Sequence, residues 1–200
     1  MCFHSKQSKS AQELKVRFKA NFPQEEAYKT GVYNGFQHPQ TPVITQANPS
    51  SIELFSWGLL PAWAKDESFR KNTLNARIET IQEKPSFRNV THNHCLVLVN
   101  GFYEWQWLDA QGKHKQKYLL HLPNNEAFAL AGLWSSWVDK STGEIRHTYT
   151  ILTTEASGLM REIHNSTLRM PIILHENSEH DWLAGKIYQT GYENLVASPI

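Results

Sequence analysis

Short apolar, β-prone runs dominate the chain from Ile52 onward. Each is bounded by Gly, Pro, Asn or Asp, and together they predict strands at Ile52–Trp57, Cys95–Val99, Tyr118–Leu122, Phe128–Trp134 and His147–Thr153. Two shorter strands are predicted, at Val43–Thr45 within the turn-rich stretch Gly31–Pro49 and at Pro171–Leu174. Spacing of this kind favours a mainly antiparallel barrel or sandwich core over βαβ units.

Helical patterns are few and lie between or after these runs. The first begins near Ala11, where Ser10 and Glu13 form a capping-box pattern. Further helical pieces fit around Arg77–Gln82, Glu155–Ile163 and Ser178–Ala184. The sequence therefore predicts an α+β fold, a single domain over residues 1–200 with a mainly antiparallel, β-barrel-like core and peripheral helices.

Composition narrows the class of protein. The chain has 200 residues, 40% of them hydrophobic and 20% charged, which is ordinary for a globular domain. Its formal net charge is only +1, so any contact with nucleic acid has to come from a local basic patch. An apolar signal-peptide stretch and a run of about 18 apolar residues are both missing, so we expect a soluble protein of a bacterial-type cytosol. We also expect a monomer.

The cysteine and histidine pattern argues against a metal or cofactor. The two cysteines, Cys2 and Cys95, form no CxxC pair. In the run His92-Asn93-His94-Cys95 the side chains are too close together to surround one ion, and Cys95 opens an apolar strand. We expect neither a metal nor a cofactor.

Cys2 is the first candidate for chemistry. Removal of Met1 would leave a free α-amine beside the thiol, with ordinary pKa values of roughly 7.7–8.0 and about 8.5, so both groups would be partly nucleophilic near neutral pH. With an aldehyde, the amine can form an imine and the thiolate can then close a five-membered thiazolidine ring. An internal cysteine has no such amine. The alternative is that a cysteine stands at position 2 by accident.

Asn75 and Arg77 lie in a polar run that interrupts the β-rich pattern. An Asn can hydrogen-bond an amine or a sugar hydroxyl, and an Arg can bind a phosphate with two parallel hydrogen bonds. The alternative is that Asn75 caps a helix with solvated charges behind it.

Glu104 and His164 are candidates for proton transfer. Glu104 stands between aromatic residues directly after an apolar strand, and burial there would raise its pKa. The alternative is an outward-facing Glu at a strand edge. His164 falls at the predicted C-terminal end of a helix, where the helix dipole favours the protonated imidazole.

Five motifs, in order along nearly the whole chain, resemble the SRAP (SOS-response-associated peptidase) family. They are Met1-Cys2, Trp57-Gly58-Leu59-Leu60-Pro61-Ala62-Trp63, Asn75-Ala76-Arg77-Ile78-Glu79-Thr80, Gly101-Phe102-Tyr103-Glu104-Trp105, and Ile163-His164 with Arg169-Met170-Pro171. The resemblance implies an SRAP-like fold with a basic groove for single-stranded DNA. It also implies that mature Cys2 crosslinks covalently to abasic sites and shields them as part of the DNA damage response.

The resemblance also implies roles for individual residues. Asn75 would orient the Cys2 amine or the sugar, Glu104 would be the acid–base group for ring opening and imine formation, and His164 would assist proton transfer and reversal of the crosslink.

DNA-binding roles follow from the same motifs. Arg77 and Arg169 would hold phosphates that flank the lesion, and Trp63 would stack near a displaced base. Family members commonly begin Met-Cys-Gly-Arg, whereas this chain has His4 in place of the Arg. His4 can still bind a phosphate, more strongly when protonated.

Two other functions remain open at this level. A cysteine peptidase could use Cys2 and His164, in the narrowest case only to remove its own Met1. A non-catalytic binder of single-stranded or modified DNA would need neither group for chemistry.

Overall fold

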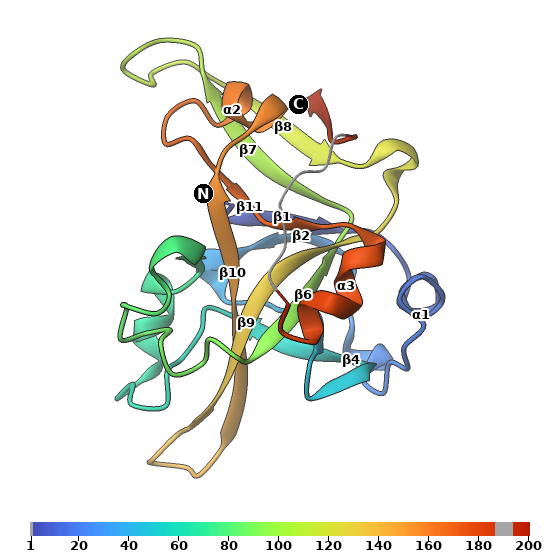
Figure 1. Ribbon diagram of the computed structural model, residues 1–200, viewed down its shortest axis with the longest axis vertical. Coiled ribbons are helices and arrows are strands. Elements are labelled where there is room, and N and C mark those ends of the chain that lie inside the picture. The colour runs from blue at the N-terminus through green and yellow to red at the C-terminus, as the bar shows by residue number, and fades with distance from the viewer. Residues whose placement is uncertain (1, 187–193) are drawn as a thin grey trace.

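Five strands close into a barrel at the centre of the molecule. The computed structural model describes residues 2–186 and 194–200. The barrel strands are β3 (Gln40–Thr45), β4 (Asn48–Trp57), β6 (His94–Val99), β9 (Phe128–Val138) and β10 (Ile145–Glu155). They pair in the order β10-β4-β3-β6-β9, and β9 pairs again with β10 to complete the ring (Figure 1). All pairs in the ring are antiparallel except β4 with β10, which is parallel.

Three short strands extend the barrel sheet. They are β5 (Asn75–Arg77), β11 (Arg169–Pro171) and β12 (Ile173–Leu174). β5 runs parallel to β10, β11 runs antiparallel to the end of β10, and β12 pairs with β9. These additions gather near one end of β10.

A second, five-stranded sheet lies against the barrel. Its order is β13 (Val196–Pro199), β8 (Lys115–His121), β7 (Gly101–Trp107), β1 (His4–Gln7) and β2 (Gly31–Asn34). β7 follows β6 with only Asn100 between them, so the chain passes directly from the barrel into this sheet.

The α-helices of the described residues lie outside the strands, as Figure 1 shows. They are α1 (Ala11–Phe18), α2 (Gly158–Ile163) and α3 (Glu176–Leu183). Short 3-10 helices occupy Glu25–Ala27, Gly35–Gln37, Glu67–Asn72, Ile78–Thr80 and Pro123–Asn125. Within the described residues, no helix is both long enough and apolar enough to cross a bilayer.

The barrel strands are apolar on both faces because both faces are buried. In β6, Cys95, Val97 and Val99 belong to the cluster that fills the barrel, while Leu96 and Leu98 belong to the cluster that includes Leu14 of α1 and Trp182 of α3. This is why the apolar run of β6 does not alternate with polar residues.

Close packing of the barrel depends on Gly132 of β9. A Cβ at this position would lie 2.8 Å from both the Cys95 sulfur and the Thr150 carbonyl oxygen. The main-chain oxygen cannot move aside without breaking the sheet, so a side chain here has no room.

The fold confirms the predicted α+β class, the barrel-like core and the capping box at Ser10 and Glu13. The helix predicted at Arg77–Gln82 is wrong, because Arg77 ends strand β5 and a 3-10 turn follows at Ile78–Thr80. The strand predicted at Pro171–Leu174 is divided between β11 and β12, which pair with different neighbours. The sequence patterns also missed β1, β2, β7 and β13.

Candidate active site

Cys2 lies two residues before the start of strand β1 and is fully buried. It belongs to the cluster that fills the barrel, together with Trp57 and Tyr149, whose stacked rings lie 6.2 Å apart. Its Sγ lies 3.8 Å from the carbonyl oxygen of His4 and donates a weak hydrogen bond to it. Met1, whose removal the predicted chemistry requires, lies outside the described residues.

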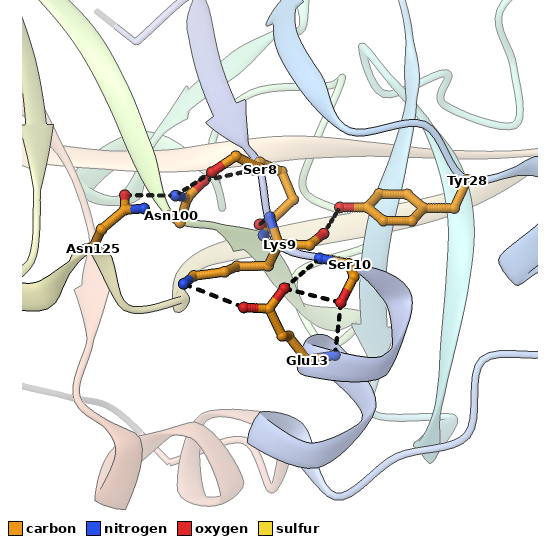
Figure 2. A network of polar contacts seen from close by, with 8 residues as sticks. Ser8, Lys9, Ser10, Glu13, Tyr28, Asn100 and Asn125 are labelled. Atoms are coloured by element: carbon orange, nitrogen blue, oxygen red, sulfur yellow. Dashed lines mark hydrogen bonds and ion pairs between the residues drawn. The ribbon is translucent and has the colours of Figure 1, made fainter.

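A polar network holds the chain immediately after β1 (Figure 2). Asn100 accepts from the main-chain N–H of Ser8 at 2.8 Å and donates to Ser8 Oγ at 2.8 Å and to Asn125 at 2.7 Å. Tyr28 donates to the carbonyl of Lys9 at 2.8 Å. Since Asn100 joins β6 to β7 and is itself buried, this network fixes β1, and with it Cys2, relative to the barrel.

Asn75 begins strand β5 and contacts Cys2 directly. Its Nδ2 donates to the Cys2 carbonyl oxygen at 2.9 Å, and its backbone is held by the pairing of β5 with β10. Its Oδ1 is buried and has no hydrogen-bond partner in the described part of the chain. Asn75 therefore orients the Cys2 backbone and keeps an acceptor available, and it is not the helix cap of the alternative interpretation.

Glu104 lies on the inner face of β7, and only 3% of its surface is exposed. The outward-facing alternative is therefore wrong. Burial raises the pKa of Glu104 to about 7, as predicted from its aromatic neighbours. A carboxyl group with such a pKa is present in both protonation states near neutral pH and can donate or accept a proton.

His164 is the C-cap residue of helix α2 and faces Glu104. Its Nε2 lies 3.7 Å from Glu104 Oε2 and 3.1 Å from Thr167 Oγ1. Its Nδ1 lies 2.6 Å from the Arg169 carbonyl oxygen. Because a carbonyl only accepts, Nδ1 carries the proton in the neutral ring and Nε2 is left with its lone pair toward Glu104.

Two predictions about protonation are corrected by the burial of these groups. The pKa of His164 is lowered by burial, so the imidazole is neutral at pH 7; helix α2 has six residues, and its dipole does not outweigh desolvation. The pKa of the Cys2 thiol is raised well above its ordinary value, by burial and then by the charge of Glu104. The resting sulfur is therefore a thiol, and it must lose its proton as it reacts.

Three of the residues predicted to bind DNA are partly or largely exposed. Arg77 is exposed and lies on the same face of β5 as Asn75, because side chains alternate along a strand. Trp63 is 48% exposed, donates to the Pro85 carbonyl, and packs edge-on against Phe69. His4 lies edge-on to the ring of Trp105, and its pKa is lowered by burial and by Lys117, so it becomes protonated only at a pH below its ordinary range.

Arg169 has a different environment. It is buried, donates to both carboxylate oxygens of Glu79 at 2.9 Å, and also donates to the carbonyl oxygen of Thr153 at 2.7 Å. These contacts join β11, β10 and the turn after β5. The predicted phosphate contact of Arg169 stays a prediction, and it would compete with this set of bonds.

The four residues predicted to carry the chemistry thus come from β5, β7, the C-terminal end of α2 and the segment before β1. The family model described as SOS response associated peptidase (SRAP) matches residues 1–199. The chain belongs to the SRAP family.

Several SRAP relatives carry a functional name. The abasic site processing protein YoqW of Bacillus subtilis (strain 168) is 36% identical over 158 residues, which cover 78% of this chain and 68% of the relative. Abasic site processing protein YoaM of the same organism is 38% identical over 158 residues, 78% of this chain and 67% of the relative. Abasic site processing protein HMCES of Gallus gallus is 32% identical over 151 residues, covering 64% of this chain and 43% of that longer protein.

Solved structures share the SRAP architecture. A crystal structure of a protein from Bacteroides thetaiotaomicron matches with a TM-score of 0.89 and 32% identity, over 100% of this chain and 92% of that one. A crystal structure of a protein from Bordetella bronchiseptica matches with a TM-score of 0.83 and 22% identity, over 100% of this chain and 99% of that one, which supports the fold.

One residue of this SRAP site was not assigned a role from the sequence. Asn165 accepts from the main-chain N–H of Trp107 and donates to its carbonyl oxygen, both at 2.9 Å. It thereby ties the loop that follows His164 to the strand that carries Glu104. Its position next to His164 was the only available signal, and that signal does not reveal a partner 58 residues away.

Proposed function

We propose that this chain, after loss of Met1, acts as a monomer that captures abasic sites in single-stranded DNA through a covalent link to Cys2. The observation that carries the proposal is the convergence of Asn75, Glu104 and His164 around the one residue that can present an amine and a thiol together. The names of the relatives, abasic site processing proteins, point to the same class of lesion.

The proposed reaction is a condensation that releases one water. The Cys2 amine attacks the aldehyde carbon of the ring-opened sugar, and the resulting carbinolamine loses water to give an imine. The sulfur then adds to the imine carbon as the thiol proton leaves, and the nitrogen regains a proton. The product is a thiazolidine in which the former aldehyde carbon is bonded to both nitrogen and sulfur.

Glu104 is suited to both proton transfers. In its protonated form it can give a proton to the departing water, and as a carboxylate it can accept the proton of the Cys2 thiol. With a pKa of about 7 it passes between these forms without a large energetic penalty. Neutral His164, with its Nε2 directed toward Glu104, can exchange a proton with it or with the sugar oxygen.

Asn75 holds the nucleophile in place. By donating to the Cys2 carbonyl it fixes the peptide plane next to the amine, and its buried Oδ1 can accept a hydrogen bond from that amine or from the sugar. Around this centre, Arg77, Arg169, Trp63 and His4 remain the proposed contacts to the flanking phosphates and bases.

A denaturing gel tests the proposal. Purified protein is incubated with a single-stranded oligonucleotide that carries one abasic site, and a shifted band is expected. Cys95→Ala removes the other cysteine and should still shift, whereas Cys2→Ala should not. An oligonucleotide with a tetrahydrofuran in place of the abasic sugar has no aldehyde and should give no band. Absence of a band with wild type, or an equal band with Cys2→Ala, overturns the proposal.

Cys2→Ser separates the two nucleophiles. This variant keeps the amine but loses the sulfur, so it should give a link that is trapped by borohydride and is otherwise lost on heating. The wild-type link should survive heating without borohydride. Equal heat stability of both links would contradict the thiazolidine.

The amine requires removal of Met1, which intact-mass measurement detects. If the chain removes Met1 itself, as the narrow peptidase interpretation holds, Glu104→Gln should retain Met1 while wild type loses it. Loss of Met1 from both would assign the step to a cellular aminopeptidase and leave the capture reaction unaffected.

A further inference from the structure

The outer face of the second sheet carries aromatic rings and lysines in register. On β7, Glu104 is directed to the site, so its neighbours Tyr103, Trp105 and Trp107 lie on the opposite face. On β8, Lys117 pairs with Trp105 and Lys115 pairs with Trp107, which places both lysines on that same face. We call these five residues the aromatic–lysine face.

The side chains of this face contact one another. The Nζ atom of Lys117 lies 4.2 Å from the centre of the Tyr103 ring and 5.6 Å from that of Trp105, and Lys115 Nζ lies 5.1 Å from the centre of the Trp107 ring. Gly112 packs so closely on the Trp107 ring that a Cβ there would lie 2.6 Å away. The turn between β7 and β8 therefore holds this ring in a fixed orientation.

The charge of this face has one sign. β1 adds His4 opposite Tyr103 and Lys6 opposite Gly101. Among the described residues that the strand register places on this face, none is acidic. A basic surface on a chain of formal net charge +1 is the local patch that nucleic-acid binding requires.

This face and the site lie on opposite sides of β7. Strand β1 begins at His4, opposite Tyr103, whereas β7 continues to Trp107. Along this extension the main-chain N–H of Trp105 bonds the Glu104 carboxylate, and the polar groups of Trp107 bond Asn165 rather than a neighbouring strand. The edge of β7 beyond Tyr103 is therefore bordered by the loop that carries Asn165, and Trp105, next to Glu104 in the strand, lies on the aromatic–lysine face closest to the site along β7.

We propose that the aromatic–lysine face binds the single-stranded DNA that flanks the captured lesion on one side. Bases stack on Trp105 and Trp107, while Lys115 and Lys117 leave the rings and bind phosphates. Aromatic rings on which bases can stack, with positive charges beside them, form the kind of surface that single-stranded DNA binds without sequence preference. The inference rests on the proposed function and adds to it the path that the single-stranded DNA takes away from the abasic site.

The salt dependence of DNA binding tests whether single-stranded DNA contacts the aromatic–lysine face. Affinity for an undamaged single-stranded oligonucleotide is measured across a salt series with wild type and with Lys115→Gln/Lys117→Gln. Loss of two phosphate contacts should reduce the slope of log affinity against log salt by about 1.4. Lys140→Gln/Lys186→Gln, which removes two exposed lysines elsewhere, should leave the slope unchanged. An unchanged slope in the first variant overturns the proposal.

Oligonucleotide length provides a second test. Two series of oligonucleotides are compared at limiting protein, one with nucleotides added only on the 5′ side of the abasic site and one with nucleotides added only on the 3′ side. The crosslinking rate should increase with length in only one of the two series. That gain should disappear in Trp107→Ala, whose affinity for undamaged strands should fall about 10-fold. Circular dichroism and thermal melting establish that each variant is folded. An equal increase in crosslinking rate in both series, or an increase that persists in Trp107→Ala, contradicts the proposed path.

The two proposals fail separately. If Cys2 forms no crosslink but the lysine variant still lowers the salt slope, the face binds single strands and the capture reaction is wrong. If the crosslink forms at saturating DNA but the lysine variant has the same salt slope as wild type, the capture reaction stands and the aromatic–lysine face does not bind the DNA.

Discussion

His164 Nε2 lies 3.7 Å from Glu104 Oε2, and both side chains are buried. The imidazole is neutral because burial lowers its pKa, and the carboxyl titrates near neutral pH because burial raises its pKa. The pair therefore holds a proton that can be moved near neutral pH without first overcoming a strong ion pair.

The buried carboxyl of Glu104 should make the fold less stable at higher pH. Its folded pKa of about 7 lies above the ordinary value of 4.5, so between these values the folded state binds more protons than the unfolded state. The free energy of unfolding should then fall as pH rises from about 4.5 to 7, by up to about 3 kcal/mol. Denaturation in urea at pH 5 and pH 8 measures this difference.

Glu104→Gln is the matched control, because it keeps the shape of the side chain and removes the titration. It should lose much of the pH dependence, with both preparations shown by intact mass to have the same N-terminus. A variant as pH-dependent as wild type would assign the effect to other groups.

Asn75→Asp should slow capture. The substitution is nearly isosteric, but an ionised carboxylate cannot donate to the Cys2 carbonyl, so the hydrogen bond that orients Cys2 is lost. We expect a decrease of about 10-fold or more in the crosslinking rate at saturating oligonucleotide. Binding of undamaged strands should be little changed, which separates a positioning effect from loss of affinity. A rate equal to that of wild type would show that Cys2 is oriented by other contacts.

Asn165→Ala should act on His164 through the loop that follows it. Without its two bonds to Trp107, the loop is no longer tied to the strand that carries Glu104, and the separation of His164 and Glu104 becomes variable. We expect a crosslinking rate lowered by about 10-fold and an altered pH–rate profile. Ser166→Ala, at the exposed neighbouring position, is the control and should behave as wild type.

Arg169→Met should destabilise the fold more than it weakens DNA binding. The substitution leaves the Thr153 carbonyl without its donor and removes both bonds to Glu79, which is itself partly exposed. We expect the free energy of unfolding to fall by about 2 kcal/mol, measured by urea denaturation. Arg77→Gln, in contrast, should weaken DNA binding with little change in stability, because Arg77 is exposed. The reverse pattern would make Arg169 the phosphate ligand.

Where the sequence prediction succeeded, the information was local. The capping box of Ser10 and Glu13 depends on residues three apart, and the apolar run that forms β6 is set by its own composition. The raised pKa of Glu104 could be predicted in the same way, since its neighbours along the chain are aromatic and follow a buried strand.

Where the prediction failed, the cause was a distant partner. The polar run at Arg77 has helical character by itself, but parallel pairing with Thr153 of β10 makes it the end of a strand. His164 lies at a helix terminus as predicted, yet packing against β7 and β11, rather than the dipole of its own helix, decides its protonation. The residues of the aromatic–lysine face alternate visibly along 103–107 and 115–117, but only the register of β7 and β8 brings them together.

The order of the site residues along the chain has a consequence for synthesis. Cys2 leaves the ribosome first, whereas Glu104 and His164 follow about a hundred and more residues later, and the barrel closes only when β10 pairs with β4. Closing such a long loop is a late step in folding. A growing chain therefore has an ordinary cysteine at its start, with ordinary reactivity toward any cellular aldehyde. The proposed capture of abasic sites by Cys2 therefore requires the completed protein, in which Asn75, Glu104 and His164 surround the nucleophile.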